Sequence, residues 1–180
     1  MDIIRIKDKD FKTFLSEAVI MREISRVAAE MEHDLCDKNP LFVCVLNGSF
    51  MFAADLLRHL SFPCEVSFVK LSSYVGTVTS GKVNELIGLD FDIAGRSVVI
   101  VEDIVDTGNT MQYLLEQLRR KNPRDVRIAT LLLKPGKLQV DLKIDYVAVK
   151  IPDDFIVGYG LDYDGYGRNL REIYVETDKC

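Results

Sequence analysis

Apolar residues along this chain gather in short uninterrupted runs, and amphipathic segments separate most of these runs. Short runs rich in Val, Ile, Leu and Phe, bounded by turn residues, are typical of strands buried on both faces. Strands are predicted at 3–6, 41–46, 65–72, 98–101, 125–133 and 144–150, with a returning strand at 83–89. Helical spacing predicts helices at 13–35, 50–60 and 111–121. This alternation favours an α/β fold with a parallel, doubly wound sheet and flanking helices.

The segment 151–180 breaks this alternation, because tyrosine, glycine and acidic residues replace a further strand and helix. It is better explained as a cap over the crevice at the edge of the sheet. We therefore predict a single domain over 1–180, with a core of about 10–150 and a small hood of about 1–9 and 151–180.

Small and polar residues fill the segment 75–82, with a glycine near each end. A long segment with few apolar anchors can act as a lid that closes over a site. An ordinary exposed hairpin tip explains the same composition equally well. Both interpretations remain open from the residues alone.

Composition narrows the class of protein. The chain has 180 residues, of which 48% are apolar, so a globular domain with a substantial core is expected. The net charge is −5 and no basic stripe is visible, which disfavours a nucleic-acid partner. No apolar run is long enough to span a membrane, and the first residues lack a signal-peptide pattern. The four cysteines show no C-x-x-C spacing, so a zinc site is not expected. Cysteines that stay reduced fit a reducing compartment, so we expect a cytoplasmic location.

The stretch 97–110, SVVIVEDIVDTGNT, carries the most specific chemistry. Its apolar strand runs into Glu102 and Asp103, and a loop of small polar residues then leads into a helix. In open α/β sheets, ligands bind beyond the carboxyl ends of the strands. Free N–H groups at a helix start bind phosphate, whereas adjacent carboxylates suit hydroxyls or Mg²⁺. The stretch therefore predicts a ligand shaped like ribose 5-phosphate.

Other folds also place acids at the end of a buried strand, for example a Walker B strand or a receiver-like domain. The small-residue loop after the acids favours the phosphate ligand instead. Because that ligand is anionic and the chain is acidic, positive charge has to be supplied locally by helix N-termini, Mg²⁺ and a few Lys or Arg residues.

The order of an apolar strand, two acids, two apolar residues, an acid and a small-residue loop resembles the signature of the phosphoribosyltransferases, which bind phosphoribosyl pyrophosphate (PRPP). Three further segments extend the resemblance to the hypoxanthine-guanine branch of that family: LNGSFMFAADL at 46–56, SSYVGTVTSGKV at 72–83 and IPDDFIVGYGLDY at 151–163. The resemblance implies a type I phosphoribosyltransferase fold and a purine salvage enzyme. Such an enzyme transfers the phosphoribosyl group to N9 of hypoxanthine or guanine, giving IMP or GMP and pyrophosphate.

The resemblance also assigns roles around the sugar. Glu102 and Asp103 are expected to hold the ribose hydroxyls, directly or through Mg²⁺. Asp106 stands where the family has its proposed general base, near purine N7, and an Asx turn would suit the same residue. The residues expected to cradle the 5′-phosphate are Thr107, Gly108, Asn109 and Thr110.

By the same resemblance, Lys134 is expected to donate to the purine 6-oxo group. It would reject adenine, because the lysine N–H and the 6-amino N–H would face each other as two unpaired donors. Phe155 is expected to stack on the purine and the backbone of Ile156 to meet its edge. Asp162 is expected to contact Mg²⁺ and pyrophosphate and, through its neighbours, to bind the purine at its 2-amino group. Arg168 is expected to reach the pyrophosphate. From the residues alone, Phe155 could equally be a core aromatic of the hood and Arg168 a solvated charge.

The pyrophosphate loop, Leu46-Asn47-Gly48, departs from the family pattern, which often has Lys or Arg after the leucine. Asn47 removes one positive charge, so the backbone N–H groups are expected to carry the binding. The bond after the leucine is frequently cis in relatives. Ser73 and Tyr74 are expected to head the loop that closes over the site.

Two other functions remain open: a PRPP-binding regulatory protein of the same fold, and a phosphoribosyltransferase that prefers xanthine or guanine. The resemblance implies a homodimer or homotetramer, with the helix after Gly48 as a candidate contact. The expected partners are small-molecule substrates, with neither nucleic acid nor membrane.

Overall fold

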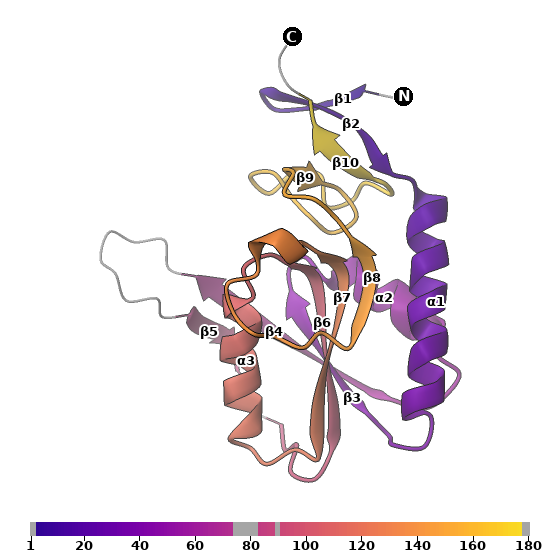
Figure 1. Ribbon diagram of the computed structural model, residues 1–180, viewed down its shortest axis with the longest axis vertical. Helices are drawn as coiled ribbons and strands as arrows, with labels where there is room; N and C mark the ends of the chain where they lie inside the picture. Colours follow the sequence, from indigo (N-terminus) through magenta and orange to yellow (C-terminus); the bar gives the residue numbers. More distant parts are fainter. Residues whose placement is uncertain (1–2, 74–82, 89–90, 178–180) are drawn as a thin grey trace.

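The computed structural model describes residues 3–73, 83–88 and 91–177. A core sheet with helices on both faces forms the larger part, and a smaller sheet lies beyond one end of it (Figure 1). The segment 75–82, for which a lid was considered, and Tyr74 lie outside the described residues.

The core sheet has six strands, and the acidic stretch lies on one of the two central ones. In spatial order the strands are β5 (Val83–Ile87), β4 (Glu65–Ser73), β3 (Leu41–Leu46), β6 (Ser97–Val105), β7 (Asp125–Leu133) and β8 (Tyr146–Lys150). Neighbouring strands are parallel except β5, which runs antiparallel to β4 at the edge. The predicted parallel sheet is therefore confirmed.

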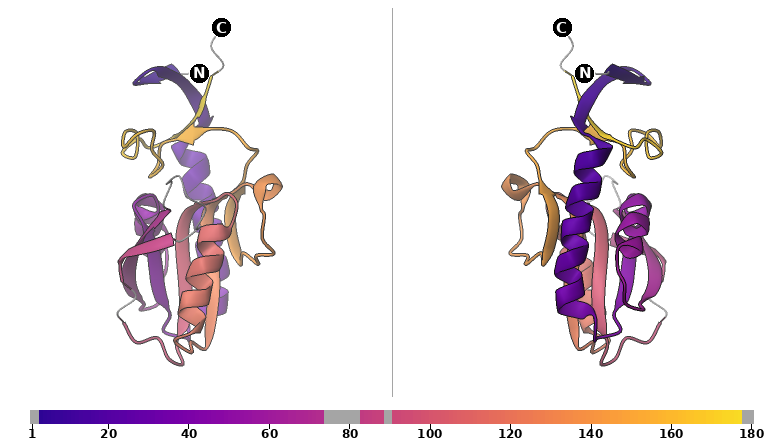
Figure 2. Two further views of the ribbon diagram at one scale, coloured as in Figure 1. Left: turned by 90° about the vertical axis from the view of Figure 1, so that its left-hand side faces the viewer. Right: turned by 90° about the vertical axis from the view of Figure 1, so that its right-hand side faces the viewer.

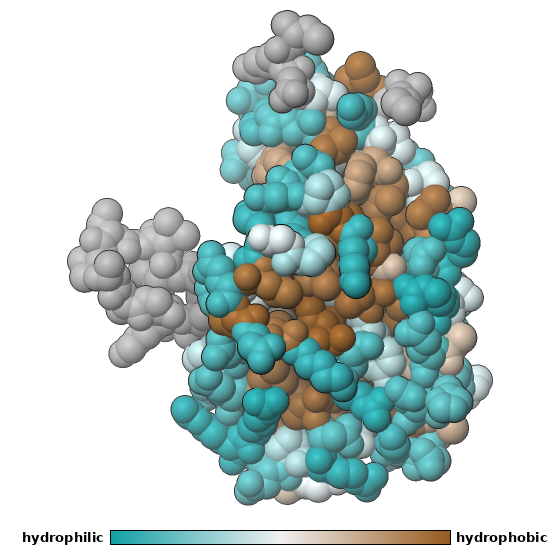
Figure 3. Space-filling view, in the orientation of Figure 1, coloured by the Kyte–Doolittle hydropathy of each residue, from teal (hydrophilic) through white to brown (hydrophobic). Residues whose placement is uncertain are grey.

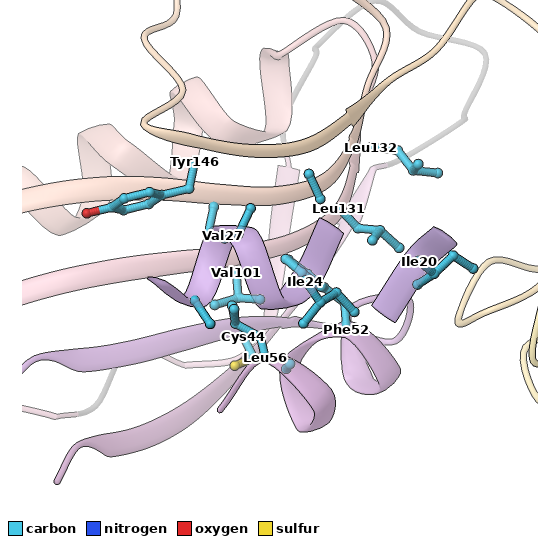
Figure 4. Packing of buried hydrophobic residues seen from close by; sticks show 14 of the residues in the cluster. Ile20, Ile24, Val27, Cys44, Phe52, Leu56, Val101, Leu131, Leu132 and Tyr146 are labelled. Atoms are coloured by element: carbon cyan, nitrogen blue, oxygen red, sulfur yellow. The ribbon is translucent and has the colours of Figure 1, made fainter. Parts of the chain in front are cut away.

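Helices cover both faces because the buried side chains of each strand alternate between them. Helices α1 (Glu17–Leu35) and α2 (Phe50–Arg58) pack on the face that carries Cys44 and Val101, as Figure 4 shows. Helix α3 (Asn109–Arg119) packs on the opposite face, and Figure 2 shows the two sides. The sheet is doubly wound, as predicted.

The chain between β7 and β8 crosses the α3 side of the sheet and begins with a short 3₁₀ turn, η1 (Pro135–Lys137). Its apolar residues Leu138, Leu142 and Ile144 are partly buried against the core on that side. Figure 3 shows apolar surface in the middle of this view, bordered by polar residues. The connection thus holds the end of η1 close to the start of α3.

The first helix begins later than the predicted 13–35. Ser16 is its N-cap and accepts a hydrogen bond from the backbone N of Val19 at 3.4 Å. The preceding residues form a strand, β2 (Lys9–Leu15), which pairs with β10 near the C-terminus. Phe14 and Leu15 pack against the same core as the helix, so the apolar spacing continues across the boundary and hides it.

Other boundaries also shift. Strand β6 continues past the predicted 98–101 to Val105, because its pairing with β7 continues through Glu102 and up to Val105. Helix α2 ends at Arg58 and α3 spans Asn109–Arg119, while β5 ends at Ile87 and β8 begins at Tyr146. The acidic residues therefore lie within the strand and share its rigidity.

The hood is a four-stranded antiparallel sheet that brings the two ends of the described chain together (Figure 1). Its spatial order is β1 (Ile3–Ile6), β2, β10 (Ile173–Glu176) and β9 (Ile156–Val157). The N-terminal part of the hood sheet thus reaches Leu15, beyond the predicted boundary near residue 9. No helix in the described part of the chain combines the length and the apolar character needed to cross a membrane.

Candidate active site

The carboxyl ends of β3, β6 and β7 lie side by side at one edge of the sheet, and the loops that follow them form the candidate site. The register aligns Cys44 with Val101, and the backbone N of Lys134 donates to the carbonyl O of Val105 at 3.0 Å. Residues expected to bind pyrophosphate, ribose and purine therefore start from adjacent strands, as expected for a ligand site in this fold.

A pocket of about 140 Å³ lies where β6 leads into α3. Its lining residues are Glu102, Ile104, Val105, Asp106, Thr107, Gly108, Thr110 and Met111. The N-terminus of α3 and two threonine hydroxyls make this pocket suitable for a phosphate group. Asn109 does not line the pocket, because its Nδ2 is turned toward Oε1 of Gln139 at 3.5 Å.

The segment after η1 supports this phosphate loop. Sequence reasoning found the loop but missed this support. The backbone N of Gln139 donates to the carbonyl O of Thr107 at 3.0 Å. Gly108 has φ of 85°, and a Cβ there would lie 2.6 Å from Cγ2 of Val140. Glycine is therefore required at position 108 both by its left-handed backbone and by the close approach of Val140.

The two adjacent acids differ in their surroundings. Glu102 is buried, and its Oε1 accepts from the backbone N of Asp103 at 3.1 Å. Oδ1 of Asp103 accepts from the backbone N of Ile104 at 3.0 Å, which orients that carboxylate. Burial, and then the neighbouring charge of Asp103, raise the pKa of Glu102. A cation or sugar hydroxyls bound at these oxygens would relieve that cost.

The pyrophosphate loop packs closely between Asp103 on one side and the hood on the other. A Cβ on Gly48 would lie 1.7 Å from Oδ2 of Asp103, and a Cβ on Gly160 of the hood would lie 2.1 Å from the carbonyl O of Gly48. The Leu46–Asn47 peptide bond is cis, as the family resemblance suggested. Asn47 is exposed at the tip. Only glycines allow these three segments to approach so closely, and sequence reasoning had missed Gly160.

Beside the acids, the two lysines after β7 are linked to two aspartates. Lys134 is 7% exposed, and its Nζ donates to Oδ1 of Asp153 at 3.1 Å and to the carbonyl O of Asp154 at 2.8 Å. Nζ of Lys137 lies 3.1 Å from the same oxygen of Asp153 and 3.3 Å from Oδ2 of Asp106. Oδ1 of Asp106 is shielded from solvent and has no hydrogen-bond partner among the described residues.

These ion pairs change the acid–base properties of the group. Hydrogen bonds from Lys137 and Lys134 lower the pKa of Asp153. Hydrogen bonds to Asp153 and Asp106 raise the pKa of Lys137. Both groups are therefore charged at neutral pH. Sequence reasoning found Lys134 and Asp106 but missed Lys137 and Asp153. The position of Lys137, three residues after Lys134, was the one local signal for it.

Phe155 stands at the edge of an aromatic cluster in the hood. Its ring is in edge contact with Tyr163, with centroids 5.7 Å apart, and lies 6.1 Å from Phe11. Nζ of Lys9 is 4.7 Å from its centroid. The residue remains 43% exposed, so part of the ring is available to a ligand. The neighbouring Ile156 is buried, and its backbone pairs with β10.

Asp162 and Arg168 of the hood contact each other. Nη2 of Arg168 lies 2.5 Å from Oδ1 of Asp162, and its Nη1 donates to the carbonyl O of Gly160 at 2.6 Å. Oδ2 of Asp162 accepts from the backbone N of Gly165 at 2.7 Å. Arg168 is therefore fixed within the hood rather than being a free solvated charge.

The three carboxylates expected to serve a metal are not brought together. Among the residues with a described position, no three His, Cys, Asp or Glu side chains gather as a metal-binding group. Asp162 of the hood is paired with Arg168. The oxygen donors of Glu102 and Asp103 nevertheless fit Mg²⁺, which commonly binds through one or two carboxylates together with phosphates of a substrate.

The expected loop residues are only partly described. Ser73 is the last residue of β4. Tyr74 is not among the described residues, so the closing loop stays a prediction.

A family model described as "Phosphoribosyl transferase domain" matches residues 12–164. The hypoxanthine-guanine phosphoribosyltransferase of Streptococcus thermophilus is 43% identical over 170 residues, which are 93% of this chain and 94% of that protein. The protein of that name from Bacillus subtilis is 41% identical over 165 residues, covering 91% of this chain and 92% of its own length.

Solved structures of hypoxanthine-guanine and hypoxanthine phosphoribosyltransferases have the same fold as this chain. A hypoxanthine-guanine phosphoribosyltransferase from Bacillus anthracis, crystallised with HEPES in its active site, gives a TM-score of 0.86 at 38% identity and covers 93% of this chain and 97% of its own. A hypoxanthine phosphoribosyltransferase from Staphylococcus aureus gives 0.88 at 35% identity, covering 92% and 91%. The predicted type I phosphoribosyltransferase fold is confirmed, and the chain belongs to the phosphoribosyltransferase family, within its hypoxanthine-guanine phosphoribosyltransferases.

Proposed function

We propose that this chain is a purine salvage transferase that moves the 5-phosphoribosyl group of PRPP to N9 of hypoxanthine and of guanine. One observation carries the assignment. A phosphate-sized pocket, two adjacent carboxylates and a lysine–aspartate pair occupy neighbouring strand ends. These groups match the parts of PRPP and of a 6-oxopurine in the order in which the reaction joins them.

The sugar phosphate would be held at two points. Its 5′-phosphate lies against Thr107, Gly108 and Thr110, where the α3 amides supply positive charge. Its hydroxyls meet Glu102 and Asp103, whose orientation the β6 strand fixes. Binding at both points restrains C1′ and presents it to the base, which lowers the entropic part of the barrier.

The proton of the purine has an acceptor in Asp106. The lone pair of N9 forms the bond to C1′, and the C1′–O bond breaks with its electron pair going to pyrophosphate. The proton on N7 moves to the carboxylate of Asp106. Atoms and charge balance, because the nucleotide loses one proton and the enzyme gains it.

Lys134 and Phe155 supply recognition of the base. An ammonium group has three donors, and two of those on Lys134 are already used within the protein. The remaining donor suits the 6-oxo group and leaves a 6-amino group unpaired. The exposed part of the Phe155 ring supports stacking on the purine, with the Ile156 backbone at the purine edge.

The leaving pyrophosphate would be bound by the backbone of the Leu46–Gly48 loop and by Arg168. When bound, Mg²⁺ supplies charge neutralisation of the pyrophosphate, with Glu102 and Asp103 as its protein ligands and Asp162 as a hood contact. Asn47 adds no charge there, so this chain relies on Arg168 and the loop amides.

A PRPP-binding regulator of the same fold is the other class of function. A regulator needs the phosphate pocket but has no use for a proton acceptor beside a donor for the 6-oxo group. Asp106 and Lys134 are both present and adjacent, which favours the enzyme.

We also propose a homodimer or homotetramer. Phe50, Val66 and Phe68 are each more than 40% exposed. The register aligns Val66 with Phe42 and Phe68 with Cys44, so both project on the face that carries α2. An apolar patch over α2 and β4 suits contact with a second copy. The free thiols of Cys36, Cys44 and Cys64 support a reducing, cytoplasmic location.

Steady-state turnover with PRPP and Mg²⁺ tests the function against hypoxanthine, guanine, xanthine and adenine. Hypoxanthine and guanine are expected to react, with kcat/KM for adenine at least about 100-fold lower. Excess EDTA is expected to stop turnover, since the acidic site cannot neutralise pyrophosphate alone. Binding of PRPP without turnover of any base would favour the regulator. A preference for xanthine would change the substrate but keep the reaction.

A further inference from the structure

A continuous chain of four charged groups lies beside the purine site, and its two middle members have no role so far. The order is Asp106, Lys137, Asp153 and Lys134, joined by contacts of 3.3, 3.1 and 3.1 Å. We propose that Lys137 and Asp153 are positioning residues that set the spacing between Asp106 and Lys134 and thereby select the purine edge. The inference rests on the proposed function of those two outer residues.

The hydrogen-bond inventory of the outer residues supports this assignment. Lys134 uses one donor on Asp153 and one on the Asp154 carbonyl, so one N–H remains. Asp106 accepts from Lys137 at Oδ2 only, and a carboxylate has about four lone-pair sites, so its carboxylate keeps further acceptor capacity. One donor and one acceptor are thus left unpaired on neighbouring strands.

A purine with a 6-oxo group and a proton on N7 presents an acceptor beside a donor along one edge. That edge is the complement of the pair left by Lys134 and Asp106. Adenine in the same tautomer presents two donors and leaves the Lys134 donor without an acceptor, which costs binding free energy. Selection therefore depends on the distance between the two protein groups as well as on their identity.

Asp153 is needed because both lysines contact one of its oxygens. Two ammonium groups that close repel each other unless a shared anion lies between them. Lys137 in turn joins this anion to Asp106. The four groups carry two positive and two negative charges, so loss of either middle member leaves an unbalanced charge next to the purine.

A purely structural role is a poor explanation for this chain of contacts. The side chains of Lys137, Asp106 and Asp153 are 37%, 40% and 56% exposed. Ion pairs with that exposure contribute little to folding. Variants at the middle positions should therefore fold, and their effect should appear in catalysis and in base selection.

The test compares Lys137→Met and Asp153→Asn with two controls from the same connection between β7 and β8. The controls are Lys143→Met, which removes a lysine that is 87% exposed, and Asp141→Asn, which removes an exposed carboxylate. Lys137→Met is expected to lower kcat for hypoxanthine by about 10- to 100-fold, with the KM for PRPP within about two-fold of the unaltered protein. Lys137→Arg should restore most of the lost rate.

Asp153→Asn is expected to raise the adenine to hypoxanthine ratio of kcat/KM by about 10-fold, because a neutral amide holds Lys134 less firmly than the shared carboxylate does. Thermal midpoints of all variants should match those of the controls. Lys137→Met with the kinetics of Lys143→Met, or Asp153→Asn with unchanged base selection, would overturn the inference. If Lys137→Met does not fold, Asp153→Asn decides. Failure of the unaltered protein to turn over any 6-oxopurine would instead refute the proposed function.

Discussion

Replacing Asp106 by Asn should lower kcat for hypoxanthine by about 10²–10⁴-fold, the usual contribution of a positioned proton acceptor. Asparagine keeps the shape of the side chain, and its carbonyl oxygen can still accept from Lys137, which lies 3.3 Å from Oδ2. It cannot take a proton from N7. The measurement is steady-state turnover at saturating PRPP, with Asp141→Asn as the matched control. The KM for PRPP should change little.

The contrary result is equally informative. Turnover of Asp106→Asn at the level of Asp141→Asn would reassign Asp106 to a structural part in the loop, such as an Asx turn. A lowered thermal midpoint together with a raised KM for PRPP would lead to the same conclusion. The proton would then have to leave the purine by another route.

Replacing Gly48 by Ala should reduce kcat/KM for PRPP by at least about 10²-fold, the scale of a misplaced site. The added Cβ would lie 1.7 Å from Oδ2 and 2.4 Å from Cγ of Asp103. The loop cannot withdraw easily, because its carbonyl O is packed against Gly160 of the hood. The Asp103 carboxylate must therefore move, although Oδ1 is held by the backbone N of Ile104 at 3.0 Å.

Gly136→Ala is the matched control for this substitution. Gly136 lies in η1, no atom of the described residues lies within 4 Å of an added Cβ, and its φ is not in the left-handed region. Kinetics and inhibition by pyrophosphate should be near normal in the control and strongly changed in Gly48→Ala. Equal behaviour of the two variants would mean that Asp103 can turn away without loss, which would remove it from the ribose site.

The buried strands could be predicted from the sequence because each is an uninterrupted apolar run closed by turn residues. Strand β3 matches its predicted bounds, and β6 was found but ended too early. Its final part contains the acids Glu102 and Asp103, and the pairing of Glu102, Ile104 and Val105 with β7 keeps this part in the sheet. The end of strand β2, from Thr13 to Leu15, was taken for helix because Phe14 and Leu15 extend the apolar spacing of α1.

In the candidate site, too, residues within one continuous motif could be predicted, and residues that only the fold brings together could not. Residues of the acidic stretch could be assigned because strand, acids, loop and helix follow one another in the chain. Lys137 and Asp153 could not, because each looks like an ordinary surface charge until the fold brings them together. Gly160 depends on a contact with a loop more than a hundred positions away, which no local pattern records.

A crystal structure with IMP bound tests the central claim most directly. The 5′-phosphate should lie beside Thr107 to Thr110 at the start of α3, and the 6-oxo group should be within hydrogen-bond distance of Nζ of Lys134. A phosphate found elsewhere, or a base turned away from Lys134 and Asp106, would contradict the proposed placement of both substrates.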